Sequence, residues 1–197
     1  MSISLLQFDD FASDAAAVRE AVIAGEFKTE IGPDGGEYTG ISKYPVPEWF
    51  DRVSFVVKKK IIPHISCFRL NLKGEFPHSW VHSDGLCAQY ASVLYLNPPQ
   101  QCSGGTAFWR HAGLNIDRMP TRDELLNLGL GADWFRSMME REWKDLAFWE
   151  QAGFTAMKWN RFITYPTSCF HSRFPFEGFG TTPQDGRLVW VCFYDIE

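Results

Sequence analysis

The sequence lacks the features of a membrane-spanning, secreted or nucleic-acid-binding chain. No apolar run approaches the roughly 18 residues that a membrane-spanning helix needs. The N-terminal segment has no basic stretch followed by a long apolar one, so we expect no signal peptide. The longest basic run is Lys58-Lys59-Lys60, and the formal net charge is -5. This balance does not favour a nucleic-acid partner.

Cysteine is sparse, and its spacing matches no known framework. The five cysteines form no CxxC pair, so we expect neither a disulfide network nor a structural zinc site. An odd number of unpaired thiols is typical of a reducing compartment. We therefore expect a cytoplasmic protein with buried free thiols. The cysteines are Cys67, Cys87, Cys102, Cys169 and Cys192.

Apolar and aromatic residues, in contrast, are abundant. Hydrophobic residues make up 45% of the 197 residues, and there are 17 Phe and 8 Trp. This composition excludes a disordered chain. The length suits one domain over residues 1–197 with a sizeable core, and no repeat or interdomain linker interrupts it.

The pattern of short apolar runs predicts a mainly β domain with flanking helices. These runs are rich in β-branched and aromatic residues and are separated by Gly and Pro turns, which is typical of an antiparallel sandwich or barrel. The predicted strands cover residues 54–57, 61–72, 91–97, 105–111, 160–165, 169–174 and 187–195.

Two regions depart from the strand pattern. An N-terminal extension of about residues 1–75 combines strands with a helix from about Asp14 to Ala24. A helical insert covers about residues 120–152. It begins with a capping box from Thr121 to Glu124 and continues in a helix from about Asp133 to Ala152. We expect the insert to pack against the outside of the barrel.

The segment His82-Ser83-Asp84 carries the first sign of chemistry. In an extended chain, residues i and i+2 point to the same side, so an imidazole and a carboxylate can bind one ion. His171 is a candidate third ligand. Two His and one carboxylate suit non-haem Fe(II) and oxygen chemistry. An H-x-D triplet by itself also occurs by chance, and a lone His is more often structural.

The order of motifs along the chain is more specific than any one of them. From about residue 80 to 195 the chain resembles the Fe(II)/2-oxoglutarate-dependent oxygenases, in particular their prolyl-hydroxylase-like branch. The motifs that carry the resemblance are His82-Ser83-Asp84, Val93-Leu94-Tyr95-Leu96-Asn97, Ser103-Gly104-Gly105-Thr106, His171, and Gly186-Arg187-Leu188-Val189-Trp190-Val191.

The resemblance implies a double-stranded β-helix, also called a jelly roll, with iron inside its open end. His82, Asp84 and His171 would be the catalytic Fe(II) ligands. Arg187 would pair with the distal carboxylate of the co-substrate 2-oxoglutarate, and Tyr95 would donate its hydroxyl to the same group. The implied reaction consumes O2, releases succinate and CO2, and hydroxylates a substrate.

Two departures from the family pattern affect the co-substrate site. Val189 and Val191 stand where many members have a Ser or Thr that contacts the carboxylate. The interval between His171 and Arg187 is also long, which leaves Arg173 as a rival. Arg173 would bind a substrate carboxylate or 2-oxoglutarate itself. We favour Arg187 for the co-substrate because it opens the terminal strand.

Alternation along that terminal strand gives a prediction independent of the resemblance. If Arg187 points into the barrel, so do Val189, Val191 and Phe193, while Leu188, Trp190 and Cys192 face the covering helices. Both faces are apolar, as a strand buried on both sides requires.

Two other functions remain open from the sequence. One is a cupin-like metalloenzyme that does not use 2-oxoglutarate, and the pair Arg187 and Tyr95 argues against it. The other is a non-catalytic jelly-roll binding module, which has no need of three convergent metal ligands. The sequence does not indicate whether the substrate is a small molecule or a peptide, nor the oligomeric state.

Overall fold

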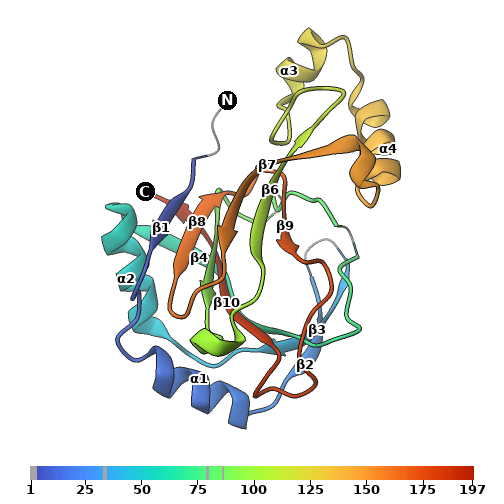
Figure 1. Cartoon of the computed structure of the whole chain (residues 1–197). Coiled ribbons are helices and arrows are strands. Elements are labelled where there is room, and N and C mark those ends of the chain that lie inside the picture. The colour runs from blue at the N-terminus through green and yellow to red at the C-terminus, as the bar shows by residue number, and fades with distance from the viewer. Residues whose placement is uncertain (1–3, 33–34, 79, 86) are drawn as a thin grey trace.

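The computed structural model describes residues 4–32, 35–78, 80–85 and 87–197, and within them two antiparallel sheets face each other (Figure 1). The larger sheet has the order β1-β8-β5-β10-β4-β3-β2 and the smaller sheet the order β7-β6-β9. The larger sheet contains β1 (Leu6–Phe8), β2 (Lys28–Ile31), β3 (Glu37–Ser42), β4 (Ile61–Asn71), β5 (Tyr90–Tyr95), β8 (Phe162–Pro166) and β10 (Arg187–Ile196). The smaller sheet contains β6 (Gly105–His111), β7 (Trp149–Ala156) and β9 (His171–Phe174). The predicted mainly β jelly roll is confirmed.

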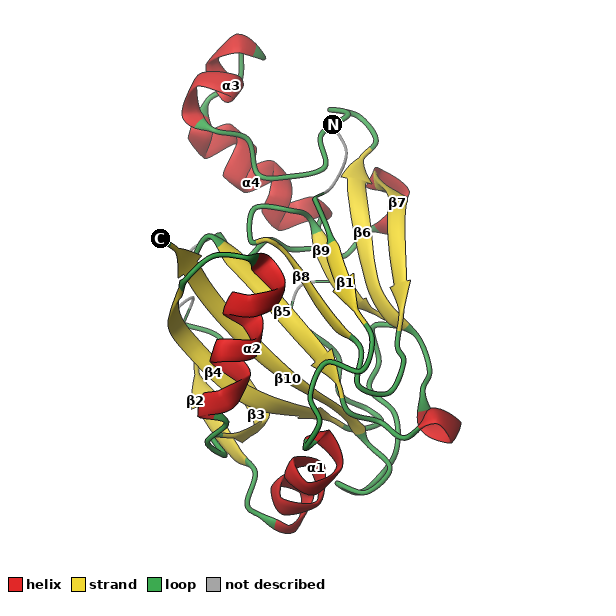
Figure 2. Cartoon of the chain, turned by 90° about the vertical axis from the view of Figure 1, so that its left-hand side faces the viewer, coloured by secondary structure: helices red, strands yellow, loops and turns green. Residues whose placement is uncertain are grey.

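Helices cover the outside of this sandwich. They are α1 (Ala15–Ala24), α2 (Pro47–Val57), α3 (Arg122–Asn127) and α4 (Ala132–Glu142), with 3-10 turns at Pro99–Gln101 and Leu146–Phe148. Helices α1 and α2 lie on the larger sheet, as Figure 2 shows. In the part of the chain that is described, no helix is long and apolar enough to cross a membrane.

The two faces of β10 confirm the predicted alternation. Leu188, Trp190 and Cys192 belong to the cluster that the larger sheet forms with α1 and α2. The Trp190 ring meets the Trp49 ring of α2 edge to face, with centroids 5.2 Å apart. Val189 lies in the other cluster, between the two sheets, with residues such as Phe108 of β6. Arg187 thus opens a strand whose odd-numbered residues face the interior.

Two predicted elements are wrong in part. Residues 54–57 are the last turn of α2, because Trp49, Val53 and Val56 recur at helical spacing and are buried together against the sheet. The helix predicted from Asp133 to Ala152 ends at Glu142, and Trp149–Ala156 forms β7 instead. Pairing with β6 overrides the helical tendency of that segment.

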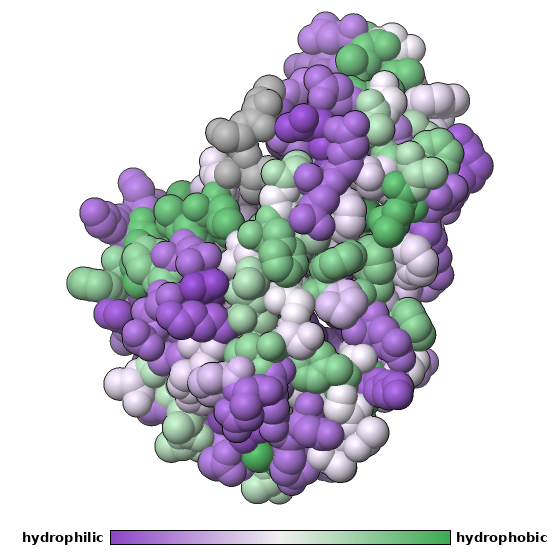
Figure 3. Space-filling view, in the orientation of Figure 1, coloured by the Kyte–Doolittle hydropathy of each residue, from purple (hydrophilic) through white to green (hydrophobic). Residues whose placement is uncertain are grey.

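The insert between β6 and β7 projects from one end of the molecule (Figure 1). The predicted capping box is confirmed, since Thr121 Oγ1 accepts from the Glu124 N–H and Glu124 accepts from the Thr121 N–H. Helix α4 buries Phe135 and Met138 in a cluster with Trp109 of β6, on the side of the smaller sheet away from the larger one. Figure 3 shows polar and apolar side chains intermixed on the surface of this projecting part.

The Gly104-Gly105 pair is required by close packing around β6. Gly104 has a φ of 70°, and a Cβ there would lie 2.1 Å from the Phe174 carbonyl oxygen. A Cβ on Gly105 would lie 2.0 Å from the Thr155 carbonyl oxygen. Only glycine allows β7 and β9 to approach the start of β6 this closely.

Asn160 fixes the turn that leads into β8. Its backbone has a φ of 56°. Its side chain accepts from the Ala12 N–H at 2.9 Å and donates to the Ala12 carbonyl at 2.8 Å, so it ties this turn to the segment before α1. Asn tolerates the left-handed conformation better than most residues because its short side chain bonds locally.

We expect Asn160→Ala to lower the free energy of unfolding by about 2–4 kcal/mol. The substitution removes two buried hydrogen bonds. It also leaves at positive φ an alanine, which has a Cβ but no side-chain oxygen to bond locally. Urea denaturation measures the loss. Asn160→Gly is the matched comparison, because it removes the same bonds without the backbone strain and should recover about 1 kcal/mol. An alanine variant as stable as wild type would contradict this role.

Candidate metal centre

His82, Asp84 and His171 converge at one point of the interior. Their candidate ligand atoms all lie within 4.8 Å of one another. His82 and Asp84 lie in the irregular segment before β5, and His171 begins β9. Reciprocal backbone hydrogen bonds join His82 and His171, with N–O distances of 3.1 and 2.9 Å. The Asp84 N–H donates to the Thr167 carbonyl at 2.8 Å. The backbone therefore sets the triad in place.

The hydrogen bonds around His171 leave one ring nitrogen for a metal. Its Nδ1 lies 3.0 Å from the Cys169 carbonyl oxygen, which can only accept, so Nδ1 carries the proton. The Nε2 atom lies 3.1 Å from Asp84 Oδ2. On the other side of the carboxylate, His82 Nε2 lies 3.8 Å from Asp84 Oδ1. A backbone carbonyl that orients a metal-binding His in this way is a common supporting contact.

Charges within the triad favour the ion pair in the absence of metal. Burial alone would raise the pKa of the Asp84 carboxyl, but the His171 and His82 rings outweigh it and the pKa is lowered. Burial would lower the pKa of the His171 ring, but Asp84 outweighs it and the pKa is raised.

The donor set fits a divalent transition metal. Two imidazole nitrogens and one carboxylate form a three-ligand face that leaves coordination positions open for other molecules, and this set suits non-haem Fe(II). His171 is buried, and the side chains of His82 and Asp84 are partly exposed. The sequence-predicted metal ligands are therefore brought together by the fold.

Metal affinity should fall as the pH falls. The metal needs His171 Nε2 without a proton, and the pKa of this ring is raised above its usual 6.5. Each unit of pH below that pKa should weaken Fe(II) binding about tenfold, and the loss should begin at a higher pH than for an unperturbed histidine. Anaerobic Fe(II) titrations between about pH 8.5 and about 5.5 measure it. An affinity that is flat over this range would argue against a histidine ligand.

Arg187 presents a buried cation to the same interior. It is 7% exposed, at the start of β10. Its Nη1 donates to Asn71 Oδ1 at 3.1 Å. Among the described residues, its side chain makes no other hydrogen bond and no ion pair with a carboxylate. Burial lowers the pKa of the guanidinium. A buried guanidinium without an anion is costly, so the position suits an anionic group supplied from outside.

Tyr95 stands beside Arg187 with its hydroxyl inside the molecule. Val189, two residues after Arg187, pairs with Tyr95 across β10 and β5. The Tyr95 hydroxyl lies 2.7 Å from Thr106 Oγ1 and is fully buried. Burial raises the pKa of this phenol, so it stays protonated and Thr106 or Tyr95 is left with a proton to donate.

Arg173 is in a different situation from Arg187. Its Nε donates to the Phe176 carbonyl at 2.6 Å, and its Nη2 donates to the Glu75 carbonyl at 2.8 Å. Its Nη1 lies 3.5 Å from Glu75 Oε1. Burial and Arg187 lower the pKa of Arg173 to about 10. All three nitrogens of its guanidinium contact the chain, whereas among the described residues the guanidinium of Arg187 has one hydrogen bond, to Asn71.

Sequence reasoning missed one interior residue, Tyr165 of β8. It is 3% exposed, and its ring centroid lies 4.8 Å from that of His171. Alternation along β8 was the available signal, since Ile163 and Tyr165 must share a face and both lie in the cluster between the sheets.

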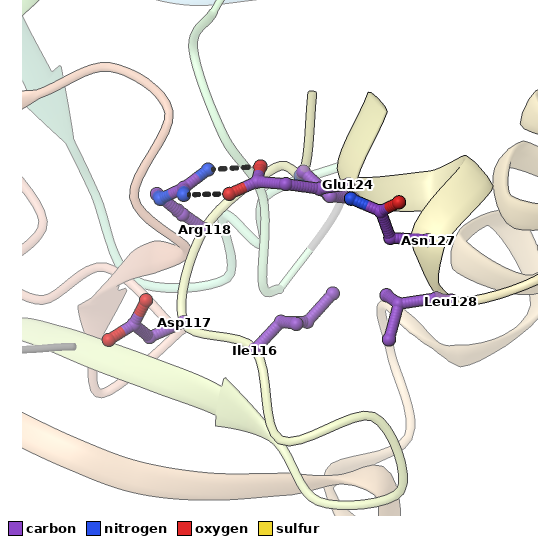
Figure 4. Close-up of a pocket in the computed structure, with 7 residues that line it drawn as sticks. Ile116, Asp117, Arg118, Glu124, Asn127 and Leu128 are labelled. Atoms are coloured by element: carbon purple, nitrogen blue, oxygen red, sulfur yellow. Dashed lines mark hydrogen bonds and ion pairs between the residues drawn. The ribbon is translucent and has the colours of Figure 1, made fainter. Parts of the chain in front are cut away.

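A separate hollow of about 290 Å³ lies within the insert, between α3 and the segment that follows β6 (Figure 4). Within it, Arg118 Nη1 and Nη2 each donate a hydrogen bond to one carboxylate oxygen of Glu124. None of the predicted site residues lines this hollow. Its lining residues are Ile116, Asp117, Arg118, Pro120, Glu124, Asn127 and Leu128.

Comparison of the sequence with models of known protein families finds one family that matches most of the chain. Residues 69–194 match the model of a family of unknown function, DUF6445. The chain belongs to this family. No curated protein matches this DUF6445 member.

Solved structures share the fold of the DUF6445 chain at low sequence identity. One is SnoK, a non-heme alpha ketoglutarate dependent carbocyclase from nogalamycin biosynthesis, with a TM-score of 0.57, 10% identity, and coverage of 98% of this chain and 79% of that one. EctD from S. alaskensis with bound Fe has a TM-score of 0.51 and 14% identity, covering 98% and 73%. A prolyl hydroxylase from Trichoplax adhaerens, in complex with a hypoxia inducible factor peptide, has a TM-score of 0.50 and 10% identity, covering 98% and 84%. The DUF6445 chain thus has the double-stranded β-helix fold of the Fe(II)/2-oxoglutarate oxygenases.

Proposed function

We propose that this chain is a non-haem Fe(II)- and 2-oxoglutarate-dependent oxygenase that hydroxylates its substrate. The observation that supports the proposal is the burial of the Arg187 guanidinium near the metal triad. Among the described residues the buried guanidinium forms no ion pair and faces the same interior as a His-Asp-His triad, which supports a site for a metal beside a site for a carboxylate. 2-Oxoglutarate, which is alpha ketoglutarate, carries both a metal-chelating end and a distal carboxylate.

Each residue has a defined role in this proposal. His82, Asp84 and His171 hold Fe(II) on one face, and the Cys169 carbonyl keeps His171 in the tautomer that binds metal. Arg187 and Tyr95 bind the distal carboxylate of 2-oxoglutarate, with Asn71 and Thr106 as their supports. When bound, the iron and the keto acid supply the activation of O2, and succinate and CO2 are released. The aromatic residues between the sheets exclude water from the centre.

Arg173 is the weaker candidate for the keto acid in this proposal. Its hydrogen bonds to the Glu75 and Phe176 carbonyls hold the segment before His82 in place. Because these contacts occupy the Arg173 guanidinium, we assign the co-substrate to Arg187. That Arg173 contacts an anionic group of the substrate stays a prediction.

Two alternatives make different predictions for the same protein. A cupin-like metalloenzyme would bind metal but show no specific affinity for 2-oxoglutarate. A jelly-roll binding module would need neither. Arg187 disfavours both, because neither needs a buried guanidinium that forms no ion pair with any described residue.

The test is an anaerobic titration of the metal-free protein with Fe(II) and then with 2-oxoglutarate. We expect a weak visible charge-transfer band that appears only when both are present. Admission of O2 should then release succinate slowly even without a substrate. A protein that binds Fe(II) but neither develops the band nor binds 2-oxoglutarate would refute the proposal in favour of the cupin-like reading.

A further inference from the structure

The hydroxyl of Tyr165 is an interior polar group to which the proposed function gives no role. Two other buried tyrosines have partners, since the Tyr95 hydroxyl bonds to Thr106 and the Tyr194 hydroxyl bonds to Thr164. Within the described residues, the Tyr165 hydroxyl has no hydrogen-bond partner. It is not among the described polar atoms that are both closed off from solvent and without a partner, so the hydroxyl keeps some accessible surface.

The sheet register separates Tyr165 from the end of the larger sheet where Arg187 lies. Tyr165 pairs with Ala91, and Ala91 in turn pairs with Phe193. Tyr95 pairs with Val189, near the other end of the same strands, where Arg187 lies. Tyr165 therefore stands two inward-facing positions further along the sheet than Tyr95, a separation of about 13 Å along the strand.

Contacts of the Tyr165 ring agree with this placement. The ring lies 4.8 Å from the His171 ring and meets the Phe108 ring edge to face at 5.1 Å. Burial raises the pKa of the phenol well above its usual value, with a further contribution from Asp84 and an opposite one from Arg187. The hydroxyl is thus a protonated donor within electrostatic reach of both halves of the site.

Ring packing alone does not account for a tyrosine here. Phenylalanine would fill the same space against His171 and Phe108, without bringing a hydroxyl into an apolar cluster. Because the hydroxyl keeps some accessible surface and has no partner among the described residues, a bound molecule can reach it and accept its hydrogen bond. The partner must offer an acceptor near the metal triad.

We propose that the Tyr165 hydroxyl donates a hydrogen bond to an oxygen atom at the metal-binding end of the keto acid. This inference rests on the proposed function and adds a third contact to it. Arg187 and Tyr95 would fix the distal carboxylate, and Tyr165 would fix the end that chelates the metal. The keto acid would then be held at both ends by the protein as well as by the ion.

The test compares Tyr165→Phe with wild type in anaerobic binding titrations. We expect the dissociation constant for 2-oxoglutarate in the presence of Fe(II) to rise about tenfold or more, because a hydrogen bond to a charged acceptor is lost. Fe(II) affinity and the thermal stability of the protein without 2-oxoglutarate should not change. The matched control is Tyr90→Phe, which alters a tyrosine of β5 that stacks on Tyr194 outside the interior.

A shorter keto acid locates the contact. Pyruvate has the same metal-binding end but no distal carboxylate. We expect Tyr165→Phe to weaken pyruvate and 2-oxoglutarate by the same factor. If the variant binds 2-oxoglutarate as wild type does, or if only 2-oxoglutarate is weakened, the proposed contact is wrong. If wild type binds no 2-oxoglutarate, the proposed function fails first, so the two failures are distinguishable.

Discussion

His82→Ala should weaken Fe(II) binding by more than about 100-fold and leave the fold intact. Loss of a supporting contact to a metal ligand already costs about 10–100-fold, and this substitution removes a ligand itself. His82 Nε2 is one of three candidate donors within 4.8 Å of one another. The side chain is 33% exposed, and the backbone bonds to His171 do not depend on it. Competition with a chromophoric chelator under anaerobic conditions measures the affinity.

His64→Ala is the matched control for this prediction. His64 also pairs with a carboxylate, since its Nε2 lies 2.9 Å from Asp195 Oδ2, but it is exposed and lies outside the triad. It should keep wild-type Fe(II) affinity. Equal losses in the two variants would mean that iron binds to surface histidines in general, and the triad would then carry no special role.

Arg187→Gln should raise the dissociation constant for 2-oxoglutarate by about 100-fold or more. The guanidinium can give a carboxylate two charge-assisted hydrogen bonds, each worth about 1.5–3 kcal/mol. Fe(II) binding should be unchanged, because Arg187 is not in the triad. The charge-transfer titration separates the two affinities in one experiment.

The same substitution should have the opposite effect on stability without ligand. Arg187 is a buried charge with Asn71 as its hydrogen-bond partner and no ion pair among the described residues. Its replacement by a neutral amide should leave the thermal unfolding midpoint unchanged or raise it. A large fall in stability would show that the residue is structural.

Arg173→Gln is the comparison that decides between the two arginines. It should lower stability, because Arg173 bonds to the Glu75 and Phe176 carbonyls, and it should affect 2-oxoglutarate less than Arg187→Gln does. If Arg173→Gln abolishes 2-oxoglutarate binding and Arg187→Gln does not, the assignment is reversed.

The strands that could be predicted from the sequence are those with strong local patterns. Residues 105–111 were predicted and form β6 with the same bounds, and β10 runs from Arg187 as expected. The errors arose where tertiary contacts decide. Residues 54–57 are β-branched and aromatic but lie on a helix face, and β7 is a strand because it pairs with β6.

The candidate site was predictable in composition but not in its contacts. The spacing of His82 and Asp84 and the order of motifs pointed to the triad, which the structure brings together. Whether Arg187 or Arg173 is available for a ligand depends on partners far away in sequence, such as Glu75 and Asn71. Tyr165 belongs to no motif, and in the sequence an inward-facing tyrosine cannot be distinguished from any other core aromatic residue. Its hydroxyl becomes notable only because it has no hydrogen-bond partner among the residues that the structure describes.

The central position of β10 also bears on how the chain folds. β4 and β5 are consecutive strands, yet β10 lies between them and brings Arg187 to Asn71 across 116 residues. Such non-local pairing slows folding, and before β10 inserts, both neighbours present open edges that can pair with other chains. Because β10 also carries Arg187, a partly folded chain would lack the proposed site for 2-oxoglutarate. If the proposal holds, 2-oxoglutarate would bind the folded chain alone and would raise its stability as the ligand concentration increases.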